Sequence, residues 1–326
     1  MSGTFFGPHG REAGLFALSG VVLSLTVGHL AWIAVAGTYL VWLAYISTMT
    51  RWSFRAPSRR KPSIQDSAWR PMDVATRRGD LRFYLSDTQP GADVVLVVHG
   101  WSSASMRMTG RARVFLEAGL NVVLVDLPSH GASASLPYWS AEESVSMLID
   151  GLNHLHQQRP NHFGHRMFFF GHSMGGFVGL RISKRRNELS LNGAWSGWVL
   201  ESPMTGYSEI FDETCRLLKL PRVFRWSLET RVLRKFRALN PSSTVKHLQD
   251  ADMPAWGMLS EPTLLVQASN DERLGNAHHE RLVHEMKQTP SVRLDVHRLD
   301  SLTHSGAHEH AERDRLVAAW LDAQPS

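Results

Sequence analysis

The residues with the clearest chemical potential are Gly-His-Ser-Met-Gly-Gly at positions 171–176, directly after three phenylalanines. An apolar strand, a Gly-x-Ser-x-Gly sequence and a helix place the serine on a sharp turn that pushes its hydroxyl out of the backbone. Gly171 and Gly175 allow neighbouring backbone to approach this turn without a Cβ clash. The helix that begins near Met174 directs its first N–H groups at any oxyanion beside Ser173. The pattern predicts a serine nucleophile, which needs a histidine base and a carboxylate to orient that base.

Strands and helices alternate around this motif. Apolar β-branched runs at 94–98 and 122–125 are typical of strands buried on both faces of a parallel sheet. Further strands are predicted at 168–170, 198–200, 263–266 and 292–296, an opening hairpin at 74–76 and 81–85, and helices at 106–117, 140–157, 278–287 and 313–321. The alternation predicts a parallel sheet covered on both faces, with its ligand site at the carboxyl ends of the strands.

Three motifs in this order resemble the α/β-hydrolase family. They are His99-Gly100-Trp101 after the third strand, Asp126 through His130-Gly131 to Ser133 after the fourth, and residues 171–176 after the fifth. The resemblance extends from about residue 72 to the end, and the Gly-His-Ser-Met-Gly-Gly sequence is similar to that of monoacylglycerol lipases, lysophospholipases and small carboxylesterases. It implies an α/β-hydrolase fold: a mostly parallel eight-stranded sheet, helices on both faces and a small helical cap. It also implies a serine nucleophile, where dehalogenases and epoxide hydrolases have an aspartate.

The resemblance also implies where the partners of Ser173 lie, because the family order is serine, acid, histidine. Asp271, in the polar loop after the seventh strand, is the expected acid, and Glu201 at the end of the sixth strand is the alternative. His304, in the loop after the eighth strand, is the expected base, and His308 is the alternative.

Backbone N–H groups are expected to form the oxyanion hole. The resemblance assigns them to Met174 and to Trp101, the residue after His99-Gly100. The spacing of His304, His308 and His310 also fits a metal cluster, but the predicted triad explains this loop without one. No metal and no cofactor are predicted.

The N-terminal segment predicts a membrane anchor. Residues 15–46 contain no charged side chain, and 30–46 are almost wholly apolar. This run is long enough for one tilted transmembrane helix and too short for a comfortable two-helix hairpin, so one crossing is predicted. The segment is too long for a cleaved signal peptide, and a buried core helix is the alternative.

Positive charge is concentrated after this segment. The formal net charge of the 326 residues is +5, and residues 51–61 hold five basic side chains and no acidic one. The positive-inside rule then places the C-terminal side in the cytoplasm, with the basic residues against anionic headgroups. The remaining chain is near neutral, which gives no argument for nucleic-acid binding. Cys215 is the only cysteine, so no internal disulfide forms.

These observations predict three regions: an anchor at 1–50, a basic Pro/Ser-rich linker at 51–71 and a hydrolase domain at 72–326. Within the last, residues 203–258 predict a helical cap, because apolar side chains recur at helical spacing among arginines. The apolar stripe of this cap either packs against the rest of the domain or lines a pocket for an acyl chain.

The predicted function is hydrolysis of carboxylic esters, including lipid or acylglycerol esters, by a single-pass membrane protein through an acyl-enzyme. The alternatives are an acyltransferase, thioesterase or amidase with the same triad, or a catalytically silent, membrane-tethered binding domain.

Overall fold

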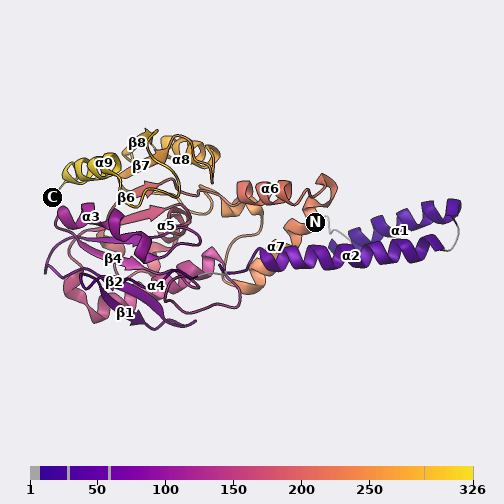
Figure 1. Ribbon diagram of the computed structural model, residues 1–326, viewed down its shortest axis with the longest axis horizontal. Helices are drawn as coiled ribbons and strands as arrows, with labels where there is room; N and C mark the ends of the chain where they lie inside the picture. Colours follow the sequence, from indigo (N-terminus) through magenta and orange to yellow (C-terminus); the bar gives the residue numbers. More distant parts are fainter. Residues whose placement is uncertain (1–7, 28–29, 58–59, 290, 326) are drawn as a thin grey trace. The chain divides into compact units, whose positions relative to one another are not determined.

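The computed structural model describes residues 8–27, 30–57, 60–289 and 291–325 (Figure 1). Its contacts divide the chain into two compact units. The first, the helical unit, consists of residues 1–55 and 211–248. The second, the sheet unit, consists of residues 56–210 and 249–326.

The sheet unit is built on eight strands in the order β1-β2-β4-β3-β5-β6-β7-β8. Strand β2 is antiparallel to both of its neighbours, and the other pairs are parallel. The strands are β1 (Arg70–Val74), β2 (Leu81–Leu85), β3 (Val94–Val98), β4 (Asn121–Val125), β5 (Met167–His172), β6 (Trp195–Glu201), β7 (Thr263–Ala268) and β8 (Leu294–Leu299). The predicted mostly parallel eight-stranded sheet is therefore confirmed.

Helices cover both faces of this sheet (Figure 1). They are α3 (Thr109–Glu117), α4 (Ala141–Gln158), α5 (Met174–Arg185), α8 (Ala277–Lys287) and α9 (Ala311–Asp322). Alternate residues of a strand point to opposite faces, so β3 and the apolar residues 122–125 of β4 supply core to both layers. On one face, Val95 and Val97 join a buried cluster that includes Phe115 of α3 and Trp320 of α9. Ser140 caps α4 as predicted, because its Oγ accepts a hydrogen bond from the Glu143 N–H (3.1 Å).

The first and last strands are shifted relative to the sequence prediction. The first strand ends at Val74, because Thr76 and Gly79 exchange backbone hydrogen bonds (3.3 Å each) and form a turn. The last strand begins at Leu294, two residues later than predicted, because the Val292 N–H donates to the Thr289 carbonyl in a turn (3.0 Å).

The loop before β7 packs tightly on α5, the helix that follows Ser173. The Trp256 indole stacks on Phe177 (ring centroids 4.6 Å apart) and donates a hydrogen bond to its carbonyl (2.9 Å). The Arg181 guanidinium, one turn further along α5, lies 4.5 Å from the Trp256 ring centroid. These contacts fix the position of α5 against the loop.

The helical unit contains α1 (Pro8–Val27), α2 (Leu30–Trp52), most of α6 (Ser208–Leu217) and α7 (Arg222–Leu239). Helices α1 and α2 lie side by side, with the Phe16 and Tyr39 rings 4.9 Å apart. Helix α7 packs on both. The segment predicted as a cap thus forms two helices.

The apolar N-terminal segment forms two helices where the sequence predicted one. The prediction rested on the uncharged run 15–46, but α1 begins before it, at Pro8, and α2 continues past it, to Trp52. Residues 8–14 lengthen α1 and residues 47–52 lengthen α2, and both stretches lie outside the uncharged run. Among the described residues, only the part of α2 from Ala31 to Trp52 is long and apolar enough to be a candidate membrane span, and this is weak evidence.

The close packing of the loop before β7 on α5 gives the first testable prediction. A Cβ on Gly257 would lie 1.6 Å from the Leu180 carbonyl oxygen, so Gly257→Ala must displace backbone. We expect a loss of about 1–3 kcal/mol in the free energy of unfolding, as for an overpacked core. Gly193→Ala is the matched control, because its Cβ would meet no atom within 4 Å. Equal melting temperatures of the two variants would contradict the close approach.

Candidate active site

Ser173 lies at the junction of β5 and α5, in a backbone conformation that a non-glycine residue rarely adopts. Its φ is 53° and its ψ is −119°. Such strain persists where surrounding structure enforces it. Here the Ser173 N–H donates to the Glu201 carbonyl (3.1 Å), and the Ser173 carbonyl accepts from the N–H groups of Met204 and Gly176 (3.0 Å each). Backbone bonds on both sides therefore hold the serine turned out of the strand.

Gly175 is required by the same turn. A Cβ at this position would lie 2.2 Å from the carbonyl oxygen of Val98, the last residue of β3. The start of α5 can approach the end of the neighbouring strand only without a side chain here.

Ser173, His304 and Asp271 are joined by a chain of hydrogen bonds. His304 Nε2 lies 2.9 Å from Ser173 Oγ, and His304 Nδ1 lies 2.9 Å from Asp271 Oδ2. All three residues are buried, with exposed fractions of 9%, 5% and 7% for Ser173, His304 and Asp271. The structure therefore brings together the three residues that the sequence selected as nucleophile, base and acid.

Four donors surround the Asp271 carboxyl group. Oδ2 accepts from His304 and from Gln267 Nε2 (3.1 Å), and Oδ1 accepts from the N–H groups of Arg273 (3.0 Å) and Leu274 (2.8 Å). Burial alone would raise the pKa of Asp271, but the hydrogen bonds from His304 and the backbone outweigh it and lower the pKa to about 2. Asp271 is thus ionised at neutral pH and can stabilise an imidazolium at His304.

Glu201, the alternative acid, is engaged elsewhere. Its Oε1 accepts from Arg111 Nε (2.9 Å) and Nη2 (2.6 Å), and its Oε2 accepts from Arg313 Nη1 (3.0 Å). Burial would raise the pKa of Glu201, but the nearby Arg111 and Arg313 charges lower it to about 2. Both oxygens are committed to arginines, so this carboxylate ties α3 and α9 to the end of β6.

His172, directly before the nucleophile, connects this ion cluster to the candidate base. Its Nε2 lies 2.8 Å from the His304 carbonyl oxygen and 3.6 Å from Glu201 Oε1. Burial lowers the pKa of His172 to about 4, so the ring is neutral at pH 7. Because a carbonyl only accepts, the His172 proton is assigned to Nε2. His172 therefore holds the backbone of His304 rather than taking part in the hydrogen-bond chain.

The other two histidines of this loop make separate contacts. His308, the alternative base, has its Nδ1 2.9 Å from the Arg107 carbonyl oxygen. His310 caps α9, where its Nδ1 accepts from the Arg313 N–H (3.1 Å). Of the three, only His304 contacts Ser173.

The His99-Gly100-Trp101 segment lies against the nucleophile. A Cβ on Gly100 would be 3.0 Å from Ser173 Cβ, so the backbone leading into Trp101 is close to the serine. His99 fixes this turn: its Nε2 accepts from the Leu127 N–H (3.0 Å), and its Nδ1 lies 2.7 Å from the Gly100 carbonyl oxygen. Met174 is the first residue of α5, so its N–H has no acceptor within the helix. Both N–H groups expected for an oxyanion hole therefore belong to backbone beside Ser173.

The Asp126 loop supports this turn. The Asp126 carboxylate accepts from the N–H groups of Ser105 (2.7 Å) and Ala132 (2.8 Å). The His130 ring packs against Trp101, with ring centroids 5.3 Å apart. This motif holds the loop beside the N–H groups that are expected to form the oxyanion hole.

A family model described as serine aminopeptidase, S33, matches residues 89–258, which is more than half of the chain. The chain belongs to this family. The matched part of the S33 hydrolase includes β3 to α7 and therefore Ser173, but it ends before Asp271 and His304.

Solved structures show the same fold. An esterase from Pyrococcus furiosus has a TM-score of 0.61 at 16% identity, covering 83% of this chain and 97% of that chain. A putative α/β hydrolase from Agrobacterium tumefaciens (TM-score 0.53, 12% identity, 78% of this chain and 95% of that chain) and a putative hydrolase from Agrobacterium vitis (0.52, 15%, 78% and 97%) are also similar. A search of curated protein sequences found no match. The predicted α/β-hydrolase fold is confirmed.

Three residues of the S33 hydrolase site were not predicted: Gln267, Arg111 and Arg313. The two arginines had a usable signal, because each lies on the apolar stripe of its helix. Arg111 lies three residues before the buried Val114 of α3, and Arg313 lies four residues before the buried Val317 of α9. A charge on a buried stripe requires a buried partner. Gln267 gave no signal, since its contact with Asp271 depends on the loop conformation.

The Glu201 cluster gives the second prediction. Glu201→Gln would leave Arg111 buried without a counter-charge and Arg313 with Asp314 as its remaining partner, so the free energy of unfolding should fall by about 3–5 kcal/mol. Glu309→Gln is the matched control, because its pair with Arg113 is exposed (57% and 59%) and such pairs are worth about 1 kcal/mol or less. Denaturant unfolding at pH 7 measures both.

The same variant has a defined pH dependence. The folded-state pKa of Glu201 is below its ordinary value of 4.5, so its contribution to stability is present above that value and is lost as the pH falls towards about 2. The difference between wild type and Glu201→Gln should therefore shrink between about pH 5 and pH 2. A difference that stays constant over this range would contradict the assigned ionisation.

Proposed function

We propose that this protein is a serine hydrolase that cleaves carboxylic esters through an acyl-enzyme. The observation that supports the proposal is the hydrogen-bond chain from Ser173 Oγ through His304 to Asp271. A serine hydroxyl is a poor nucleophile until a base removes its proton, and this chain supplies the base and its orienting carboxylate.

In the proposed mechanism, Ser173 Oγ attacks the ester carbonyl while His304 Nε2 takes its proton. The N–H groups of Trp101 and Met174 stabilise the resulting oxyanion. His304 then gives the proton to the departing alcohol, which leaves an acyl group on Ser173. Water, deprotonated by His304, releases the acid and restores the serine.

We further propose that the enzyme works at the cytoplasmic face of a membrane on esters with acyl chains. The apolar residues 31–52 and the basic residues from Arg51 onwards support membrane attachment and this orientation. Amide cleavage is the second candidate, because the matching family is described as serine aminopeptidase. Acyl transfer and thioester cleavage use the same three residues.

The third prediction tests the reaction. The full chain should hydrolyse p-nitrophenyl esters, with an optimum in a chain-length series, and Ser173→Ala should lower kcat by about 10⁵–10⁶. Ser301→Ala, a substitution at an exposed serine outside the hydrogen-bond chain, is the control. Turnover of aminoacyl anilides but not of esters would favour the amidase. A folded protein that neither turns over substrate nor reacts with a fluorophosphonate probe would identify a silent binding domain.

The fourth prediction separates the two carboxylates. Asp271→Asn should lower kcat by about 10³–10⁴, because the amide no longer stabilises the imidazolium and can favour the wrong tautomer. Glu201→Gln should change kcat far less at a temperature where both variants are folded, as checked by circular dichroism. The reverse order of effects would identify Glu201 as the acid.

A further inference from the structure

The charge of the chain is unevenly divided between its two units. The helical unit, residues 1–55 and 211–248, contains twelve basic and four acidic residues, an excess of eight positive charges. Since the whole chain carries +5, the sheet unit carries a net −3. The sequence pattern placed the excess positive charge in residues 51–61. Helix α7 also carries several basic side chains and a single acidic one. A unit with this excess is attracted to anionic surfaces.

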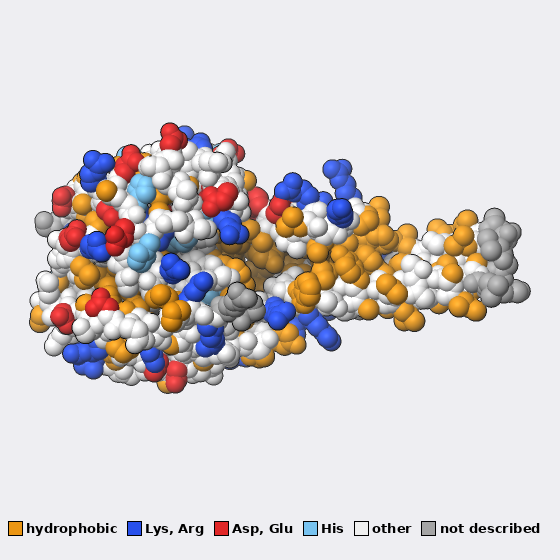
Figure 2. Space-filling model, in the orientation of Figure 1, with side chains coloured by type: hydrophobic (Ala, Val, Ile, Leu, Met, Phe, Trp, Pro, Cys, Tyr) orange, Lys and Arg blue, Asp and Glu red, His pale blue; other side chains and the backbone are white. Residues whose placement is uncertain are grey.

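The same unit exposes large apolar side chains on α1 and α2. They include Leu18 (62%), Val22 (58%), Ile33 (71%), Leu40 (65%) and Val41 (70%). Figure 2 shows hydrophobic side chains along these two helices and basic side chains near α7. Water-facing surfaces rarely hold apolar patches of this kind, so this surface fits the hydrocarbon of a bilayer.

Polar contacts hold the start of α1 to α7. The Glu12 carboxylate is fully buried and pairs with the Arg231 guanidinium and the Ser227 hydroxyl of α7. Near the start of α7, Phe224 packs on Trp42 of α2 (ring centroids 4.5 Å apart). The first turn of α1 therefore lies on the same side of a membrane as α7, whose chain continues directly into the sheet unit.

The two helices project a limited distance beyond this contact. From Gly14 to the end of α1 at Val27 there are 13 helical steps, or about 20 Å at about 1.5 Å per residue. The hydrocarbon core is about 30 Å thick. Helix α7 cannot add to the inserted length, because Arg222, Arg234 and Arg237 are exposed on it.

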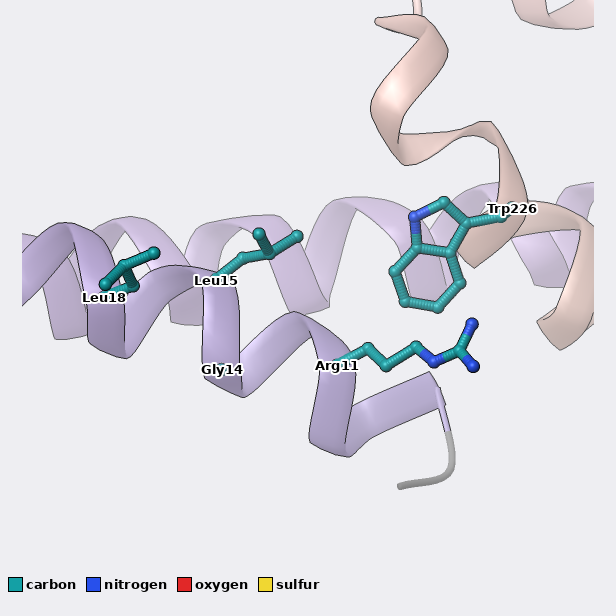
Figure 3. A pocket seen from close by; sticks show the side chains of 5 residues that line it. All are labelled: Arg11, Gly14, Leu15, Leu18 and Trp226. Carbon is teal, nitrogen blue, oxygen red and sulfur yellow. The ribbon is translucent and has the colours of Figure 1, made fainter. Parts of the chain in front are cut away.

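A hollow at the base of α1 marks where headgroups would lie. Leu15, Leu18 and Gly14 line it on one side, and Arg11 and Trp226 on the other, around a volume of about 460 Å³ (Figure 3). The Arg11 guanidinium lies 6.0 Å from the Trp226 ring. At a membrane surface, arginine and tryptophan side chains lie at the level of the headgroups and leucine side chains lie along the acyl chains. The residues that line this hollow follow the same order.

We propose that the helical unit is a one-sided anchor for anionic membranes. Helices α1 and α2 insert as a hairpin from the face on which the sheet unit lies, without crossing, and the arginines of α7 bind anionic headgroups. The inference rests on the proposed membrane attachment and is independent of the proposed ester hydrolysis. It replaces the single crossing predicted from the sequence with a hairpin whose two ends share one face.

The fifth prediction tests topology in the full chain. Cys215, the only cysteine and a buried one, is replaced by serine, and one cysteine is introduced by Gly10→Cys, Val22→Cys or Asp87→Cys. In sealed membrane vesicles, a membrane-impermeant maleimide should label Gly10→Cys and Asp87→Cys from the same face and Val22→Cys from neither. Labelling of Gly10→Cys and Asp87→Cys from opposite faces would establish a single crossing and overturn the proposal. Labelling of Val22→Cys from the face opposite to Asp87→Cys would show that the hairpin spans, which would also overturn it.

Flotation with vesicles tests the lipid partner without reference to activity. The protein should bind vesicles of phosphatidylcholine mixed with phosphatidylglycerol more tightly than phosphatidylcholine alone. Arg222→Gln with Arg234→Gln should weaken binding to the mixed vesicles by about tenfold, whereas Arg159→Gln with Arg315→Gln, in the sheet unit, should not. Ile33→Asp should weaken binding to both vesicles by about a hundredfold, and Val296→Asp, at an exposed valine of β8, should not. Equal binding to the two vesicles, or equal losses in the controls, would overturn the proposal.

Discussion

The buried Glu201 carboxylate is the contact on which the packing of the helices beside the site depends. It lies at the end of β6, beside the nucleophile strand, and its two oxygens bind arginines from α3 and α9. Those helices cover one face of the sheet, so a single carboxylate joins the strand end to that helical layer. Burying one carboxylate among two guanidinium groups is stabilising only while all three remain paired, since desolvation is costly for each. This dependence makes the cluster a rigid base for the loops above it.

Rigidity matters because Ser173 and His304 are 131 residues apart in sequence and must meet at hydrogen-bond distance. Ser173 is held by backbone bonds to Glu201 and Met204, and His304 is held by the hydrogen bond from His172 to its carbonyl. His172 and Ser173 are adjacent, so the same turn positions the candidate nucleophile and the candidate base. The positive φ of Ser173 directs its hydroxyl towards His304. The backbone hydrogen bonds around Ser173 offset the strain of this conformation.

The two units of the chain carry opposite kinds of surface. The sheet unit carries a small net negative charge, whereas the helical unit combines a large positive charge with exposed apolar side chains. With the proposed membrane attachment, a hydrolase with this division would stay at a lipid surface through the helical unit while the sheet unit holds the chemistry. Membrane attachment and catalysis then depend on different residues and can be altered separately.

The sequence by itself determined the fold class and the three candidate residues Ser173, Asp271 and His304. It could do so because the strained turn at 171–176 requires glycines at fixed positions, and because all-apolar strands are recognisable from local composition. Only the tertiary structure distinguishes the contacts of Asp271 from those of Glu201, because His304 reaches the Asp271 carboxylate whereas arginines occupy both oxygens of Glu201. It also decided that the apolar N-terminal segment forms two helices, because Glu12, a charge that limits the uncharged run, is neutralised by Arg231 more than two hundred residues away in sequence. Contacts between distant segments leave no local pattern, so no stretch of the sequence alone could reveal them.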